Sequence, residues 1–181
     1  MTSHYRGAWD SVANPKSSKE FPVDSAEATE IGDLMWWDDK LKVARSAAAA
    51  STWSGSQDGT QGKVAEHFIG IARSAFAVGD VSALVRIESR GVYRLPVTTA
   101  ATFEVGDRVT ASKDPAGNVL FAQQVDKGAV GPAPAYEPTI RSRELTIGRA
   151  AKRATTAVNI IEVEILGTRE AGGSVRQYLT S

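Results

Sequence analysis

Apolar and polar residues alternate with a period of two over several short stretches, which is the pattern of half-buried β-strands. In 84–88 the order is Leu-Val-Arg-Ile-Glu, and in 158–166 three aliphatic residues face one way while Glu162 and Glu164 face the other. Further β-rich runs are 64–72, 91–97, 103–112, 119–125 and 145–150. Turn signals separate these runs at roughly 8–12-residue spacing. The pattern predicts a mainly β chain with little helix, folded as a small antiparallel β-barrel or sandwich.

The 181-residue chain divides into three parts by its composition and by the periodicity of its apolar residues. Residues 1–30 show neither helical nor strand periodicity and predict an extended N-terminal arm. Residues 31–167 hold the strand-like runs and predict the β-barrel domain, and 168–181 predict a flexible C-terminal tail. Within the barrel domain, 51–63 is expected to be a loop, since it is rich in Gly and Ser and contains Asp58-Gly59. The short alanine tract before it could close one helical turn.

One short pattern recurs three times as an apolar residue followed by Gly-Asp. The copies are Ile31-Gly32-Asp33, Val78-Gly79-Asp80 and Val105-Gly106-Asp107. Glycine permits a positive φ and aspartate can bond nearby backbone N–H groups, so each copy predicts a compact turn that launches a strand. Three copies suggest a barrel with similar corners. A second repeated motif links Ile69-Gly70-Ile71-Ala72 with Ile147-Gly148-Arg149-Ala150. Shared turn chemistry is sufficient to explain both repeated motifs.

Charge and cysteine content narrow the function classes. Acidic and basic residues are equal in number, at 21 each, whereas a nucleic-acid binder usually carries a basic excess or stripe. We therefore expect no nucleic-acid partner. The chain has no cysteine, which excludes disulfides and thiolate metal sites. No apolar run approaches the ~18 residues that span a bilayer, so we expect no membrane partner.

The sequence holds few residue combinations that are typical of catalytic, metal-binding or phosphate-binding sites. His67 stands beside Glu66 without a second histidine at metal-ligand spacing. Gly62-Lys63 resembles the end of a phosphate loop, but the required first glycine and the hydroxyl residue after the lysine are both missing. Two close carboxylate pairs, Asp38-Asp39 and Glu162 with Glu164, are expected in a turn and on a solvent-facing strand. We predict a protein that is not an enzyme, with no catalytic residues, no cofactor and no metal.

Aromatic residues in unusual places are the candidate contact residues. Tyr5, Trp9 and Phe21 lie in the predicted arm, where a purely solvated tail would hold few aromatics. Trp37 follows another tryptophan, and since adjacent strand residues point to opposite faces, one of the two is expected in the core and the other at a contact. Trp53 lies in the predicted loop. These five residues are the hypothesised capsid or subunit interface under the resemblance described next.

The order of short motifs resembles one known family. The motifs are Ile69-Gly70-Ile71-Ala72, Gly91-Val92-Tyr93-Arg94-Leu95-Pro96, Gly106-Asp107-Arg108-Val109 and Ile147-Gly148-Arg149-Ala150. Over about residues 31–167 the chain resembles the small β-barrel decoration, or cement, proteins of tailed bacteriophages. The resemblance implies a virion protein that is made in the bacterial host cytoplasm and binds the outer surface of the expanded icosahedral head. Its partners would be the major capsid protein and itself, as a homotrimer.

Two other interpretations remain open at this stage. The first is a carbohydrate- or receptor-binding module of a head fibre or tail, with Trp36, Trp37 and Trp53 as its contact surface. The second is a small β-barrel enzyme or accessory domain in which His67 would titrate. The missing nucleophile, metal cluster and phosphate loop count against the second.

Overall fold

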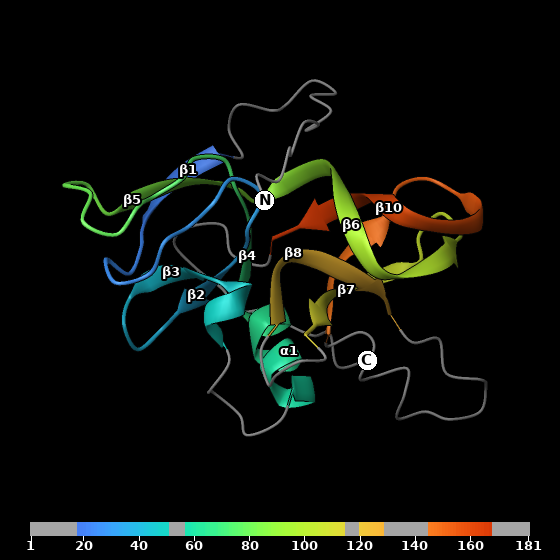
Figure 1. Ribbon diagram of the computed structural model, residues 1–181, viewed down its shortest axis with the longest axis horizontal. Coiled ribbons are helices and arrows are strands. Elements are labelled where there is room, and N and C mark those ends of the chain that lie inside the picture. Colours follow the sequence, from blue (N-terminus) through green and yellow to red (C-terminus); the bar gives the residue numbers. More distant parts are fainter. Residues whose placement is uncertain (1–17, 51–56, 115–119, 129–144, 168–181) are drawn as a thin grey trace, which may run out of the picture.

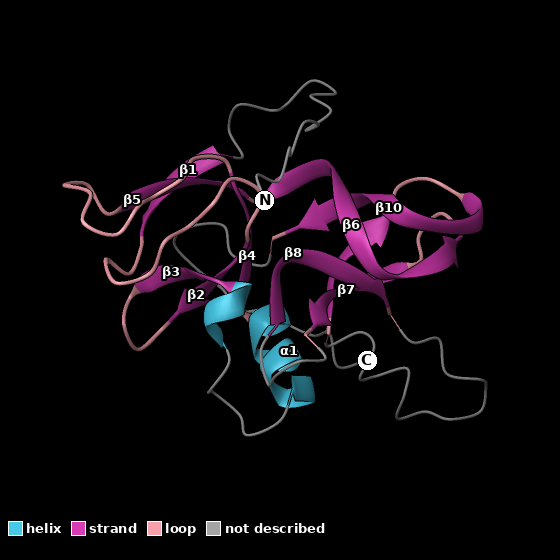
Figure 2. Ribbon diagram, viewed as in Figure 1, coloured by secondary structure: helices cyan, strands magenta, loops and turns pink. Residues whose placement is uncertain are grey.

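The computed structural model describes residues 18–50, 57–114, 120–128 and 145–167, which are mainly β-structure (Figures 1 and 2). The strands are β1 (Ser18–Pro22), β2 (Leu34–Asp38), β3 (Val43–Ser46), β4 (Phe68–Ala72), β5 (Leu84–Glu88), β6 (Arg90–Phe103), β7 (Arg108–Lys113), β8 (Leu120–Lys127), β9 (Thr146–Ala150) and β10 (Ala154–Leu166). The helical segments are the 3₁₀ turn η2 (Ala47–Ala50) and α1 (Gln57–Glu66). The predicted fold class, a mainly β barrel with little helix, is confirmed.

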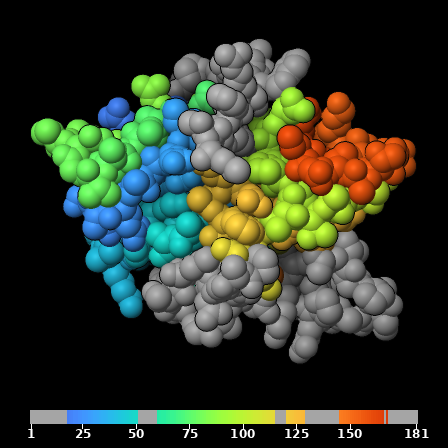
Figure 3. Space-filling model, in the orientation of Figure 1, coloured from blue at the N-terminus to red at the C-terminus, as the bar shows by residue number. Residues whose placement is uncertain are grey.

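The strands form two five-stranded units that follow one another in the chain. The N-terminal unit (18–88) is a sheet in the order β1-β5-β4-β2-β3. The C-terminal unit (90–166) is a closed barrel, and reading around it from β6 gives β6-β10-β9-β7-β8. The two orders are the same when β1 is matched to β6, β2 to β7, and so on. Figure 3 shows the units on the left and right, with residues 120–128 in gold between them.

The match between the two units extends to the register of individual residue pairs. The corresponding pairs are Leu34–Ile71 with Arg108–Arg149, Met35–Gly70 with Val109–Gly148, Trp36–Phe68 with Thr110–Thr146, Phe21–Val85 with Leu95–Ile161, and Val23–Ala44 with Val97–Val125. Even the bulge between the second and third pairs is repeated. The last pair is parallel in both units: it closes the C-terminal barrel, and in the N-terminal unit it is a single bridge. The chain therefore contains an internal structural repeat, and shared turn chemistry alone does not explain the repeated sequence motifs.

The Gly-Asp turns have one geometry in all three places. The glycines have φ values of 101°, 95° and 89°. In each turn the aspartate Oδ2 accepts the backbone N–H of the residue three positions earlier, at 3.1, 2.9 and 2.8 Å for Asp33, Asp80 and Asp107. In the two turns that precede β2 and β7, the backbone of the Gly-Asp pair forms hydrogen bonds with the backbone of Ala72 and Ala150, which are the last residues of the second repeated motif. The predicted turn chemistry is confirmed.

The interior of each unit is filled by the same positions. Buried counterparts are Val23 and Val97, Met35 and Val109, Ala44 and Val125, Ile69 and Ile147, Ala72 and Ala150, Val85 and Ile161, and Ile87 and Val163. The N-terminal set forms a separate cluster, whereas the C-terminal set continues into a larger core with Leu34, Trp36 and Phe68. That continuation joins the two units, since these three residues come from the N-terminal unit.

The predicted loop at 51–63 is wrong in its second half, because α1 begins at Gln57; residues 51–56 lie outside the described part. Two glycines inside the helix lower its local propensity, so the helix is stabilised by packing instead. Its buried residues Thr60, Gln61, Val64 and Ala65 face the sheets, and Gln61 donates to the Ala111 carbonyl in β7. The predicted helical turn in the alanine tract is present as η2.

The predicted arm boundary at residue 30 also differs from the structure. β1 pairs with β5 over its whole length, from Ser18 with Glu88 to Pro22 with Leu84. Val23 is buried in the N-terminal core at 4% exposure. Residues 18–30 therefore belong to the folded unit, because an antiparallel partner strand supplies the order that their sequence lacks. Residues 1–17 and the predicted tail at 168–181 lie outside the described residues.

Candidate functional site

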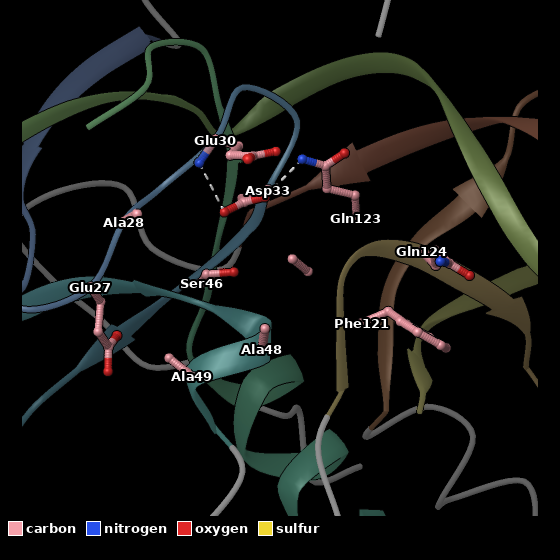
Figure 4. Close-up of a pocket in the computed structure, with 11 residues that line it drawn as sticks. Glu27, Ala28, Glu30, Asp33, Ser46, Ala48, Ala49, Phe121, Gln123 and Gln124 are labelled. Carbon is pink, nitrogen blue, oxygen red and sulfur yellow. Dashed lines mark hydrogen bonds between the residues drawn. The ribbon is translucent and has the colours of Figure 1, made fainter. Parts of the chain in front are cut away.

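A pocket of about 640 Å³ opens between the two units (Figure 4). One wall comes from the N-terminal unit and carries Glu27, Ala28, Glu30, Asp33 and Ser46, with Ala48 and Ala49 of η2. The facing wall is β8, through Phe121, Ala122, Gln123 and Gln124. The pocket therefore combines an acceptor-rich side with a short apolar floor.

Asp33 is the most buried charged group of the pocket, at 4% exposure. Its Oδ2 accepts the Glu30 N–H at 3.1 Å and its Oδ1 accepts Gln123 Nε2 at 2.9 Å, the second bond crossing from β8 to the N-terminal unit. Burial raises the pKa of the Asp33 carboxyl above its ordinary value, and these two hydrogen bonds oppose that rise. No lysine or arginine pairs with Asp33 among the described residues, so its charge is stabilised by dipoles alone.

Ser46 lies beside Asp33 with an unsatisfied hydroxyl. The residue is 7% exposed, and within the described ranges its Oγ has no hydrogen-bond partner. The hydroxyl is close enough to Asp33 to lower the pKa of that carboxyl, but not in a geometry that makes a hydrogen bond. Figure 4 shows the side chain directed into the pocket. A buried polar atom without a partner loses hydration without compensation, which marks the place where a polar group of a ligand would be stabilised.

The other two carboxylates of the pocket differ from Asp33. Glu27 pairs with the Arg45 guanidinium, and the same hydrogen bond raises the pKa of Arg45. Glu30 is exposed on the rim. Within the described ranges, no three His, Cys, Asp or Glu side chains are arranged to hold a metal ion. The arrangement is suited to binding a donor group rather than to coordinating a cation with several carboxylates.

The predicted contact residues are placed as follows. Phe21 and Trp37 lie against each other, half-buried, with ring centroids 6.1 Å apart in an edge-on arrangement. Trp36 is 1% exposed and donates its indole N–H to the Ser46 carbonyl at 3.0 Å. The expectation that one tryptophan of the pair lies in the core is therefore confirmed by Trp36, and the contact role of Trp37 stays a prediction. Tyr5, Trp9 and Trp53 lie outside the described residues.

The burial of Trp36 also corrects one alternative. A glycan platform made of Trp36, Trp37 and Trp53 would need the Trp36 ring at the surface, and the ring is in the core instead. Sugar stacking on that residue is excluded because its faces are covered by packed side chains, including Arg45 at 5.8 Å from the ring centroid.

The other residues considered as catalytic candidates from the sequence lie at turns or on the surface. His67 ends the turn between α1 and β4 rather than lying in a strand, and its Nδ1 is 3.2 Å from Asp39. Asp38 caps a turn by accepting the N–H groups of Lys40 and Leu41, as expected for that carboxylate pair. Glu164 is exposed on β10, as the alternation predicts.

Comparisons of the chain with protein-family models, with curated proteins and with solved structures find no match. In the described ranges, neither helical segment has the length and apolar character needed to cross a membrane.

The pocket was not predicted from the sequence. Asp33 was singled out as a turn residue, but Gln123 lies 90 positions away. A signal was available in the repeat itself, because aligning the two halves shows that Ser46 stands where the second half has a charged residue.

Proposed function

We propose that the protein is a capsid decoration protein of a tailed bacteriophage, which binds the outside of the expanded icosahedral head and stabilises adjacent major capsid subunits. It would act as a homotrimer, without catalysis. The proposal rests on the resemblance of its short motifs to that family.

The observation that carries the proposal is the structural role of those motifs. Ile69–Ala72 and Ile147–Ala150 occupy matching strands of the two units, and Gly106-Asp107 forms the turn that bonds to the second of them. The motif from 91 to 96 lies in β6, which pairs with β10. Each motif is therefore part of the framework of the repeat. The motifs that carry the resemblance therefore hold framework positions in both units.

The repeat also gives a single chain two similar outer surfaces. Leu84 and Ile160 are large apolar residues at matching positions, exposed at 48% and 52%. Each pairs with a proline, Pro22 and Pro96 respectively. Ile31 and Val105, at the tips of the matching turns, are exposed at 50% and 68%. Repeated apolar contacts on one chain suit a lattice of repeated subunits, because linked contacts raise avidity without stronger individual contacts.

The mechanism follows from mass action. A ligand that binds the expanded lattice and not the precursor lattice stabilises the expanded form by RT ln(1 + [L]/Kd) per site. No chemical step is required, and the stabilisation grows with occupancy. The two-unit chain would connect capsid subunits that internal DNA pressure tends to separate.

Co-sedimentation tests the proposal. The purified protein is mixed with expanded, undecorated heads and, separately, with unexpanded precursor heads of a candidate phage. Saturable binding to expanded heads alone is expected, and its plateau gives the copy number. Absence of binding to either form, or equal binding to both, would remove the head-stabilising role.

A further inference from the structure

The repeat allows the pocket to be compared with its counterpart in the C-terminal unit. Asp33 corresponds to Asp107, since each closes a Gly-Asp turn with the same hydrogen bonds. Ser46 corresponds to Lys127, since Met35 pairs with Ser46 as Val109 pairs with Lys127. The same pair of positions is therefore carboxylate and hydroxyl in one unit, and carboxylate and ammonium in the other.

The C-terminal unit shows how its carboxylate is satisfied. Lys127 Nζ lies 2.7 Å from Asp107 Oδ2 and donates to the Thr102 carbonyl at 2.8 Å. Thr102 corresponds to Ala28, because Phe103 and Thr29 hold matching pairings with Ala154 and Phe76. An ammonium group in the C-terminal unit is thus held by a turn aspartate and a backbone carbonyl.

Among the residues that the structure describes, the N-terminal unit has the matching acceptor positions but no lysine at this place. Ala28, Asp33 and Ser46 all line the pocket, and the Ser46 hydroxyl, which is directed toward it, has no hydrogen-bond partner among the described residues. The contrast appears in the acidity of the two carboxyls. Burial would raise the pKa of Asp107, but the hydrogen bond and charge of Lys127 lower it, whereas the pKa of Asp33 is raised by burial.

We propose that this pocket is a receptor for the ammonium group of a lysine side chain presented by a partner protein. The ammonium binds the Asp33 carboxylate and the Ala28 carbonyl and donates to Ser46 Oγ. The four-carbon stem lies along Ala48, Ala49, Phe121 and Ala122 of the pocket, as lysine stems do on apolar surfaces. Glu30 on the rim adds negative charge that attracts the incoming cation.

The ammonium site is independent of head binding, since it is defined by the internal repeat and can exist with any lysine-bearing partner. Its test therefore uses a small probe. Backbone amide resonances of the full-length protein are followed by NMR while Nα-acetyl-lysine methylamide is added at constant ionic strength. Nα-acetyl-norleucine methylamide, which lacks the ammonium group, is the matched control.

The expected result is a saturable shift of the Ala28, Glu30, Asp33 and Ser46 amides with the lysine probe and none with the norleucine probe. Ser46→Lys should abolish the response, because its own ammonium then occupies the site as Lys127 does in the other unit. The reciprocal variant Lys127→Ser should gain a second response at Asp107. No saturable shift in the native protein, or an undiminished shift in folded Ser46→Lys, would overturn the proposal.

Discussion

Gly70 in β4 lies directly against the backbone of Glu88 in β5, so that a Cβ on residue 70 would stand within the space of the Glu88 carbonyl oxygen. Its φ of 141° adds to the requirement for glycine. The matching glycine of the second unit, Gly148, has the same neighbour: a Cβ there would be 2.6 Å from the Glu164 carbonyl oxygen. The close approach of these strands is therefore part of the repeated framework.

Gly70→Ala is expected to destabilise the protein by about 3 kcal/mol or more, because both the backbone contact and the positive φ oppose a side chain. Gly79→Ala is the matched control, since Gly79 also has a positive φ but nothing within 4 Å of its Cβ position. It should cost only about 1–2 kcal/mol. The free energies of unfolding are measured in urea. Equal losses for the two variants would contradict the role given to the Gly70 contact.

Much of this framework can be predicted from the sequence, and part of it cannot. The Gly-Asp turns and the strands at 84–88 and 146–150 follow from turn chemistry and alternation. The repeat is visible as Phe21-Pro22-Val23 against Leu95-Pro96-Val97, but these short matches gain meaning only once their partners are known. Phe21 and Pro22 end β1 and Val23 follows it, whereas the second match lies inside β6, which continues past its proline to Phe103.

The missed elements have physical reasons. β1 has no alternation of its own and takes its order from β5. α1 contains Gly59 and Gly62, and forms because Val64 and Ala65 bury a face against the sheets. The pocket depends on residues brought together from distant parts of the chain, which local pattern reasoning does not reach.

Asp33 and Asp107 should affect the pH dependence of stability with opposite signs. Burial raises the pKa of Asp33 above 3.8, against its hydrogen bonds. The folded state then binds more protons than the unfolded state between 3.8 and the raised value, so this residue makes the free energy of unfolding fall as pH rises through that window. The free-energy difference between the native protein and Asp33→Asn should therefore decrease as pH rises above 3.8.

Asp107→Asn is the matched comparison. Burial would raise the pKa of Asp107, but Lys127 holds it below 3.8, so the stability that this residue contributes is present above 3.8 and lost as pH falls through the lowered pKa. Urea unfolding of both variants and the native protein across acidic pH gives the two differences. Slopes of the same sign would contradict the account of the two turns.

Truncation separates the N-terminal residues from the fold. Removing residues 1–17 should leave the unfolding midpoint unchanged, because the pairings described for both units begin with β1 at Ser18. Removing residues 1–30 should unfold the N-terminal unit, since it deletes β1 and the Val23 bridge. If Tyr5 and Trp9 are anchors, the shorter truncation weakens head binding while the fold survives. Unchanged binding would exclude them as anchors.

The exposed apolar pair offers a surface test of the proposed function. Leu84→Ser and Ile160→Ser should each lower the free energy of unfolding by only about 1 kcal/mol, because both side chains are about half exposed. The double variant should bind expanded heads more weakly than either single variant, since it removes matching contacts from both units. Thr156→Ser, an exposed position on β10, is the control. Unaltered head binding by the double variant would remove this surface from the interface.

The head-stabilising role is tested most directly by heating expanded, undecorated heads with increasing amounts of the protein. The temperature at which the heads are disrupted should rise with protein concentration, as expected for a ligand of the expanded lattice, and should level off when binding saturates. Precursor heads should show no change. A disruption temperature that stays constant while the protein is bound, or an equal rise for precursor heads, would contradict the proposed function.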